Sequence, residues 1–176
     1  MREIVLDTET TGVEANGGDR IVEIGCLELV NHCPSGRSFH CYLNPQRPMS
    51  EGAFRVHGLS DAFLADKPLF AAVADAFEGF IADARLVIHN AAFDIGFLNM
   101  ELKKIGRGPI EQARVVDTLA MARRKHPGAG NSLDALCTRY GIDNTRRTKH
   151  GALLDAEILA EIYFELIVGK QTSLGL

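Results

Sequence analysis

The stretch VLDTETTG occupies residues 5–12 and follows the short segment MREI at the start of the sequence. It places two carboxylates, Asp7 and Glu9, two positions apart where a buried strand over residues 2–7 should end. Because successive side chains of a strand point to opposite faces, these two share one face. Like charges so close raise each other's pKa, and a bound divalent cation would relieve the repulsion. The alternative is an ordinary turn after a strand, where Asp is common.

Two further carboxylates fall where a helix should carry its apolar face. Asp94 lies in VIHNAAFDIGFL (87–98) and Asp155 in KHGALLDAEILAE (149–161), and each is followed by apolar residues three and four positions later. That spacing puts the carboxylate beside the apolar stripe of the helix. A charge buried there is costly unless something pairs with it. For Asp94 the alternative is a charge at a helix N-terminus, which the helix dipole favours.

These residues together form a candidate metal site. Asp7, Glu9, Asp94 and Asp155 supply carboxylate oxygens, which suit Mg²⁺ or Mn²⁺ better than zinc. His150 precedes Asp155 by five residues, and on one helix that spacing would separate them by about 140°. We therefore expect His150 on a loop or first helical turn, beside the metal site but not bonded to the metal.

The hydrophobic pattern predicts a single α/β domain. Apolar runs predict strands over residues 2–7, 20–30, 38–44, 85–90 and 113–118. Helical spacing predicts helices over about 68–81, 93–105, 118–125, 131–140 and 152–167, with a long loop over 45–58. An antiparallel meander extended by strand–helix units gives a five-stranded mixed sheet flanked by helices. We place the domain over residues 1–170 and expect a flexible tail over 171–176.

Three motifs in order carry a resemblance to a known family. They read LDTETTG (6–12), HNAAFDIGFL (89–98) and HGALLDAEILAE (150–161). They resemble the exonuclease motifs of the DnaQ-like DEDDh 3′→5′ exonucleases, whose fold is ribonuclease H-like, and all five polar residues of that family's motifs are present. The likeness covers nearly all of residues 3–174 and is closest to the proofreading subunits of bacterial DNA polymerase III.

The resemblance implies a division of roles within the site. Two Mg²⁺ or Mn²⁺ ions would clamp the scissile phosphate. Asp7 would bridge both, Glu9 and Asp155 would ligate the ion that holds the attacking water, and Asp94 would hold the other mainly through water. His150 would be the general base, and we expect its carboxylate neighbours to raise its pKa.

A pocket for the terminal nucleotide is implied by family position. Its candidate residues are Thr10, Val56, His57, Asn90 and Phe93. For His57, a histidine that makes a local hydrogen bond is an equal alternative.

The sequence holds further polar groups near these motifs. Arg146, Arg147 and Lys149 either steer phosphates or form a solvated basic loop. Asp117 and Asp134 stand at expected helix starts, where capping is the preferred interpretation.

The implied activity is a metal-dependent exonuclease that proofreads for the replicative polymerase and releases 5′-mononucleotides from DNA 3′ ends. Implied partners are a DNA 3′ end, the polymerase alpha subunit through an extension that would follow Leu176, and a small theta-like subunit. One alternative is a stand-alone exonuclease acting on RNA or short oligonucleotides. Another is a non-catalytic adaptor, against which the complete carboxylate set argues.

Composition is consistent with a cytoplasmic protein. The chain has 176 residues, a net charge of −4 and 46% hydrophobic residues, which indicates one soluble globular domain. No apolar run is long enough to cross a membrane, and the N-terminus lacks a signal-peptide pattern. The negative charge argues against a broad nucleic-acid-coating surface but allows a local one. Two His-Cys pairs, at 32–33 and 40–41, fit no common zinc spacing.

Overall fold

A mixed sheet forms the centre of the molecule. The computed structural model describes residues 1–174, with side chains through residue 169. The five strands lie in the order β3-β2-β1-β4-β5, which confirms the predicted five-stranded sheet. Their bounds are β1 Arg2–Thr10, β2 Ile21–Val30, β3 Cys33–Tyr42, β4 Arg85–Ile88 and β5 Val115–Asp117. β1 pairs antiparallel with β2 and parallel with β4, so the sheet is mixed as expected.

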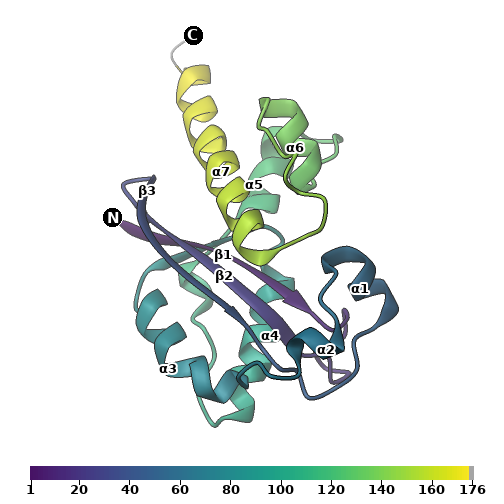
Figure 1. Cartoon of the computed structure of the whole chain (residues 1–176). Coiled ribbons are helices and arrows are strands. Elements are labelled where there is room, and N and C mark those ends of the chain that lie inside the picture. The colour runs from purple at the N-terminus through teal and green to yellow at the C-terminus, as the bar shows by residue number, and fades with distance from the viewer. Residues whose placement is uncertain (175–176) are drawn as a thin grey trace.

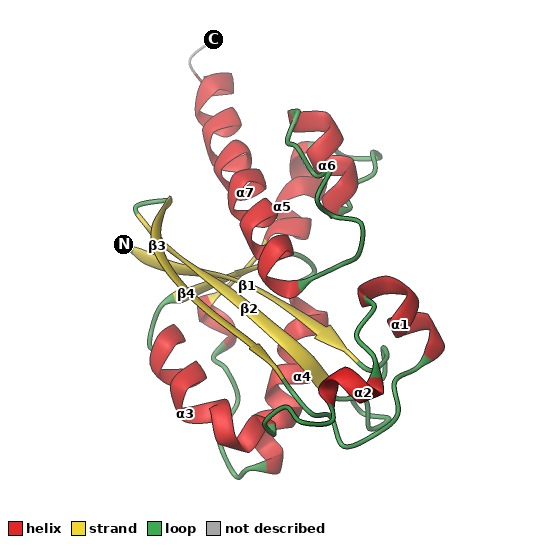
Figure 2. Cartoon of the chain, viewed as in Figure 1, coloured by secondary structure: helices red, strands yellow, loops and turns green. Residues whose placement is uncertain are grey.

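Helices cover both faces of this sheet (Figure 1). α3 and α4 lie on one face and α5, α6 and α7 on the other, while α1 and α2 stand at one end of the strands (Figure 2). The bounds are α1 Glu51–His57, α2 Asp61–Leu64, α3 Phe70–Ile81, α4 Ala91–Lys104, the 3₁₀ turn η1 Gln112–Arg114, α5 Thr118–Lys125, α6 Leu133–Tyr140 and α7 Ala152–Leu174. Among the described helices, none is long and apolar enough to cross a membrane.

Strand β1 is buried on both faces, and its alternation decides where the carboxylates point. Ile4 and Leu6 belong to the core beneath α3 and α4. Val5 belongs to the separate core beneath α5, α6 and α7. Because strand side chains alternate, Asp7 and Glu9 lie on the Val5 face, toward the start of α7.

The strand boundaries differ from those predicted by up to five residues, and the largest differences are the end of β1 and the start of β3. β1 continues to Thr10, so Asp7 and Glu9 lie within the strand, and the register with β2 shifts only between Glu9 and Thr10. β3 begins at Cys33 rather than at Ser38, because its first residues extend the antiparallel ladder with β2. Those residues are exposed and carry no apolar alternation, so periodicity gave no signal for them.

The loop predicted over residues 45–58 is wrong in its second half, which forms α1. Ser50 caps the helix by accepting a hydrogen bond from the Ala53 amide at 3.1 Å. Gly58 ends it in the left-handed conformation, at φ 71°. Prolines and glycines favour loops, but Gly58 here is the C-cap that ends a helix.

Helix α7 is longer than predicted. The expected end was residue 167, whereas the backbone is helical to Leu174. The predicted flexible tail covers residues 171–176. The structure describes only the backbone of residues 171–174 and does not describe residues 175 and 176, so the flexibility of this segment stays a prediction.

The first turn of α7 lies directly against the backbone of β2. A Cβ atom on Gly25 would lie 2.4 Å from the Ala152 carbonyl carbon and 2.4 Å from the Leu153 amide nitrogen. Only a hydrogen atom fits in that space, so the approach of helix to strand requires glycine. Asp155 lies in this same first turn, and the contact therefore sets how closely its carboxylate approaches β1.

Gly25→Ala should lower the free energy of unfolding by about 1–3 kcal/mol, the usual cost of overpacking, because the clash is between two backbones. Gly79→Ala in α3 is the matched control, since a Cβ there meets nothing within 4 Å. Alanine should stabilise that helix by roughly 0.5–1 kcal/mol. Urea denaturation measures both changes, and a Gly25→Ala protein as stable as the wild type would contradict the close contact.

Candidate active site

The predicted site residues meet in one cleft. It has a volume of about 970 Å³ and lies at the C-terminal ends of the parallel strands β1 and β4. The ten residues predicted for catalysis, metal or substrate all line it: Asp7, Glu9, Thr10, Val56, His57, Asn90, Phe93, Asp94, His150 and Asp155. They come from segments far apart in sequence, which the sheet topology brings together.

The acidic cluster has an oxygen-rich centre. One ligand atom each from Glu9, His150 and Asp155 lie within 4.8 Å of one another. The Asp7 side-chain oxygen Oδ2 is buried and has no hydrogen-bond partner among the described residues. An orphaned buried oxygen beside further carboxylates fits a hard divalent cation, which prefers oxygen ligands.

Asp94 approaches the cluster from the opposite face of β1. It lies in the first turn of α4 and is 3% exposed. Its Oδ1 accepts hydrogen bonds from the Thr8 hydroxyl at 2.6 Å and the Thr8 amide at 3.1 Å. Thr8 thus ties the start of α4 to the strand that carries Asp7 and Glu9.

The electrostatics of the cluster follow from burial. Burial raises the pKa of Asp7 well above its usual value, with Asp94 and Glu9 adding to the effect. Burial, followed by Asp155 and the nearby Glu23, raises the pKa of Glu9 to about 8. Burial also raises the pKa of Asp94 to about 7, against the hydrogen bonds from Thr8. Without a cation, these carboxyls therefore lose their protons at higher pH than ordinary carboxyls do.

His150 differs from its predicted electrostatics. We expected its pKa to be raised, but burial and the nearby Arg147 lower it, outweighing Asp155 and Asp134. The sequence motifs reveal the carboxylate neighbours of His150, whereas its burial and its proximity to the Arg147 guanidinium depend on the tertiary fold. His150 precedes the first residue of α7, in the loop as predicted, and its amide donates to the Val56 carbonyl at 2.9 Å.

His57 is held by the backbone on both sides of its ring. Its Nε2 lies 2.9 Å from the Thr10 carbonyl oxygen, and its Nδ1 accepts from the Leu59 amide at 3.0 Å. Because Nδ1 accepts, Nε2 carries the proton and donates to Thr10. His57 therefore joins α1 to the end of β1, and the local hydrogen bond weighed from sequence is present.

Asn90 takes an unusual backbone conformation at the edge of the cleft. Its φ is 66°, in the left-handed region, just before α4 begins. Its backbone amide donates to Oδ1 of Asp117 at 3.1 Å. The same oxygen caps α5 by accepting a hydrogen bond from the Leu119 backbone amide at 3.0 Å. Asp117 is thus the helix cap that the sequence predicted, and it also holds Asn90. Phe93 packs on Phe97, with ring centroids 5.0 Å apart.

Asp134 is not a helix cap, contrary to the prediction. Ser132 caps α6 by accepting from the Ala135 amide at 3.1 Å. Asp134 lies in the first turn and instead pairs with Arg147, 2.8 Å away. Side chains at a helix start compete for the same amides, and Ser132 is the residue in the capping position.

Glu23 is a buried acid beside the cluster that the motifs did not reveal. Glu23 lies opposite Glu9 in the β1–β2 ladder and is 3% exposed. Its Oε1 accepts from the Ala152 amide at 3.1 Å, so it caps the start of α7 from the sheet. His40 lies 2.6 Å from its other oxygen. An acid inside the apolar run IVEIGCLELV (21–30) was the available signal.

Comparison with known proteins agrees with this architecture. The RNase_T family model, described as an exonuclease, matches residues 4–163. DNA polymerase III subunit epsilon of Rickettsia felis is 53% identical over 176 residues, covering 98% of this chain and 77% of the relative. The protein of the same name from Escherichia coli is 54% identical over 181 residues, covering 99% of this chain and 74% of the relative.

Solved structures extend the comparison. Exonuclease X in complex with 5′ overhanging duplex DNA matches with a TM-score of 0.75 and 27% identity, covering 95% of this chain and 92% of that one. The nuclease domain of 3′hExo, a DEDDh family member bound to rAMP, matches with a TM-score of 0.81 and 17% identity, covering 96% and 92% of the two chains. At that identity the second match supports the fold alone.

The fold and the acidic cleft define a nuclease domain of the ribonuclease H-like class. The chain belongs to the DEDDh 3′→5′ exonucleases, and among them to the DNA polymerase III epsilon subunits. This confirms the family resemblance and the enzyme class predicted from the three motifs. Exonucleases of this family depend on divalent metal ions.

Asp7→Asn should stabilise the metal-free protein at alkaline pH. A folded carboxyl with a raised pKa binds more protons than the unfolded one, so stability falls as pH rises from the unfolded pKa through the folded one. For Glu9 that window runs from 4.5 to about 8. Removing the Asp7 charge should raise Tm at pH 8 in EDTA by about 2–6 °C, since 1 kcal/mol moves Tm by roughly 2–4 °C at this size.

Scanning calorimetry between pH 5 and pH 8 measures this effect. Asp83→Asn, at an exposed position, is the control and should melt like the wild type at every pH. An Asp7→Asn protein that melts below the wild type at pH 8 in EDTA would contradict the electrostatic account.

Proposed function

We propose that this domain removes nucleotides one at a time from DNA 3′ ends, as the cytoplasmic proofreading exonuclease of the replicative polymerase. The observation that carries the proposal is the cleft itself. A single cavity joins an acidic centre to an apolar wall that includes Val56 and Phe93. The first suits a phosphodiester with bound cations, and the second suits a nucleobase.

The carboxylates are assigned to two Mg²⁺ or Mn²⁺ ions. Asp7, Glu9, Asp94 and Asp155 would hold them. When bound, such ions neutralise charge on the phosphate and leaving oxygen and make the attacking water more acidic. Metal binding would favour the ionised form of these carboxyls, because ligands bind metals in their ionised form.

His150 is assigned as the general base. Its lowered pKa keeps the imidazole neutral at physiological pH, so a ring nitrogen can accept a proton from water. The loop holds this ring beside Glu9 and Asp155. The imidazole ring would therefore be within reach of a water molecule that the carboxylate site positions.

The terminal nucleotide is assigned to the wall of the cleft. Val56 is 42% exposed and offers apolar contact. Phe93 offers the face or edge of a ring, and Asn90 offers an amide at the rim. Both ring nitrogens of His57 already make hydrogen bonds within the protein. We therefore assign His57 and Thr10 to the wall of the pocket that surrounds the sugar and base.

DNA is the favoured substrate because of the relatives. Those most similar in sequence are named DNA polymerase III subunit epsilon, and Exonuclease X was solved with duplex DNA. Association with the polymerase alpha subunit and with a theta-like subunit belongs to the same proposal. The alternative substrate, RNA or short oligonucleotides, is an outcome of the test below.

The test is degradation of 5′-labelled single-stranded DNA, mispaired duplex DNA and RNA, with Mg²⁺, Mn²⁺ or EDTA. The wild type should shorten DNA from its 3′ end, release 5′-mononucleotides and stop in EDTA. His150→Ala should lower kcat by about 10²–10⁴-fold, the usual contribution of a general base. His126→Ala is the control, because His126 bonds Tyr140 and does not line the cleft.

The results separate the readings. No degradation of any substrate by the wild type would contradict the proposal. Faster degradation of RNA than of DNA would favour the alternative. Equal loss of activity in His126→Ala and His150→Ala would remove His150 from its assigned role.

A further inference from the structure

Arg147 lies between the acidic cluster and α6, and its side chain is buried. Only 6% of the side chain is exposed, although the residue lies in the irregular loop between α6 and α7. Its Nε donates to Oδ1 of Asp155 at 2.7 Å, and its Nη2 donates to Oδ2 at 3.0 Å. Its Nη1 lies 2.8 Å from Oδ1 of Asp134. Every guanidinium nitrogen therefore has a carboxylate partner.

This geometry orients Asp155 without using all of its oxygen ligand positions. Paired N–H groups of an arginine match the two oxygens of a carboxylate and fix its plane. An ionised carboxylate has about four lone-pair sites, of which Arg147 takes one on each oxygen. The others remain for a cation that Glu9 and Asp155 would hold together; ligand atoms of these two residues and of His150 lie within 4.8 Å of one another. Arg147 and a metal ion can therefore hold Asp155 at the same time.

Arg147 does not replace a divalent cation. One guanidinium carries a single positive charge, and Asp155 and Asp134 already share it. Asp7 and Asp94 have pKa values that burial raises, and Arg147 makes no hydrogen bond to either. The cluster thus keeps its need for a metal while one of its ligands is already aligned.

The same residue anchors the loop that carries His150. The Arg147 amide donates to the Asn144 carbonyl at 2.9 Å, which closes a turn. Three residues later, the His150 amide donates to Val56. The loop is therefore attached to α7 and α6 through one side chain and to α1 through its backbone.

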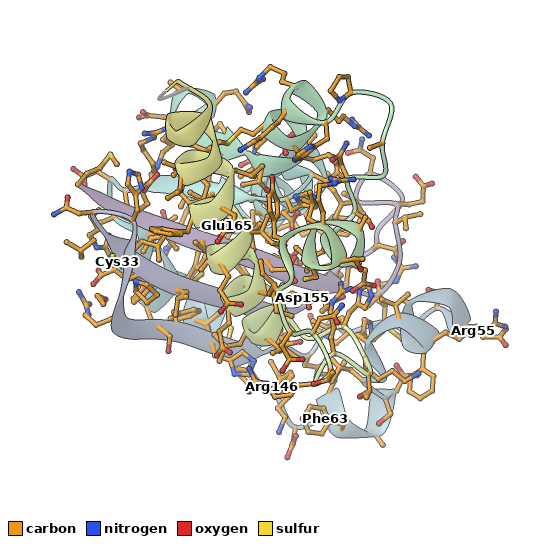
Figure 3. All side chains as sticks on the ribbon, turned by 90° about the horizontal axis from the view of Figure 1, so that it is seen from above. Cys33, Arg55, Phe63, Arg146, Asp155 and Glu165 are labelled. Carbon is orange, nitrogen blue, oxygen red and sulfur yellow. The ribbon has the colours of Figure 1, made fainter. Side chains whose placement is uncertain are left out.

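Its neighbour Arg146 has a different environment. The Arg146 side chain is 78% exposed and lies 3.5 Å from Glu157. Figure 3 shows Asp155 at the start of α7 and Arg146 nearer the edge of the molecule. Two consecutive arginines of equal charge thus offer a matched pair, one buried on a proposed metal ligand and one solvated.

We propose that Arg147 is a positioning residue of the metal site: it aligns the Asp155 carboxylate for metal binding and holds the loop that places His150. This rests on the function proposed above, in which the acidic cluster binds divalent metal ions. In metal sites, residues that orient a ligand typically contribute 10–100-fold to metal affinity.

Calorimetric titration of metal-free protein with MnCl₂ tests the proposal. Arg147→Gln should raise the Kd for Mn²⁺ by about 10–100-fold, and Arg146→Gln should leave it within about twofold of the wild type. Mn²⁺ binding by Arg147→Gln that equals or exceeds the wild type would overturn the proposal, because Arg147 would then be neutral or a competitor of the metal.

Arg147→Lys keeps the test decisive if the glutamine variant does not fold. Lysine retains the charge but lacks the planar fork that binds both oxygens, so its Kd should lie between those of Arg147→Gln and the wild type. A lysine variant with circular dichroism and Kd equal to the wild type would overturn alignment by the paired bonds. Failure of the wild type itself to bind Mn²⁺ would overturn the metal site, and Arg147's role with it.

Discussion

The close contact between the first turn of α7 and Gly25 of β2 is the constraint on which the site depends. β1 presents Asp7 and Glu9 on the face toward α7, and Asp155 reaches them only because α7 begins against the sheet. Glu23 strengthens the contact by accepting the Ala152 amide. β2 therefore positions the start of α7 in two ways. Gly25 has no side chain and lets the helix approach, and the buried Glu23 carboxylate accepts a hydrogen bond from its first turn.

This arrangement brings Asp7, Glu9 and Asp155 close together, although their burial and mutual repulsion oppose folding. The raised pKa values of Asp7 and Glu9 show that the buried ionised forms are unfavourable in the absence of a cation. The two apolar cores on either face of the sheet supply the stabilisation that holds them in place. Strain of this kind, concentrated in one cleft of a well-packed domain, is characteristic of a functional site.

Local pattern predicted the sheet and its mixed character. The three motifs and the family resemblance together implied the ten site residues that line the cleft. The sequence missed α1, whose Ser50 and Gly58 caps lie in a segment rich in loop-forming residues. It also misjudged the pKa of His150, because that shift depends first on burial and then on Arg147. Residues 146 and 147 are both arginine, so only their tertiary partners distinguish them. Burial and pairing across the chain are not encoded in local periodicity.

The loop before α7 shows how an irregular segment can be positioned accurately. Arg147 attaches it to two helices, and the Lys149 side chain donates to the Arg55 carbonyl of α1 at 3.0 Å. The His150 amide donates to the next carbonyl of α1, that of Val56. Each anchor is a hydrogen bond to a regular element, so the loop takes its geometry from α1, α6 and α7. Because Val56 also lines the cleft with its side chain, a group packed against that side chain touches the residue whose backbone holds His150. Occupancy of the pocket and the placement of the proposed base are therefore linked through a single residue of α1.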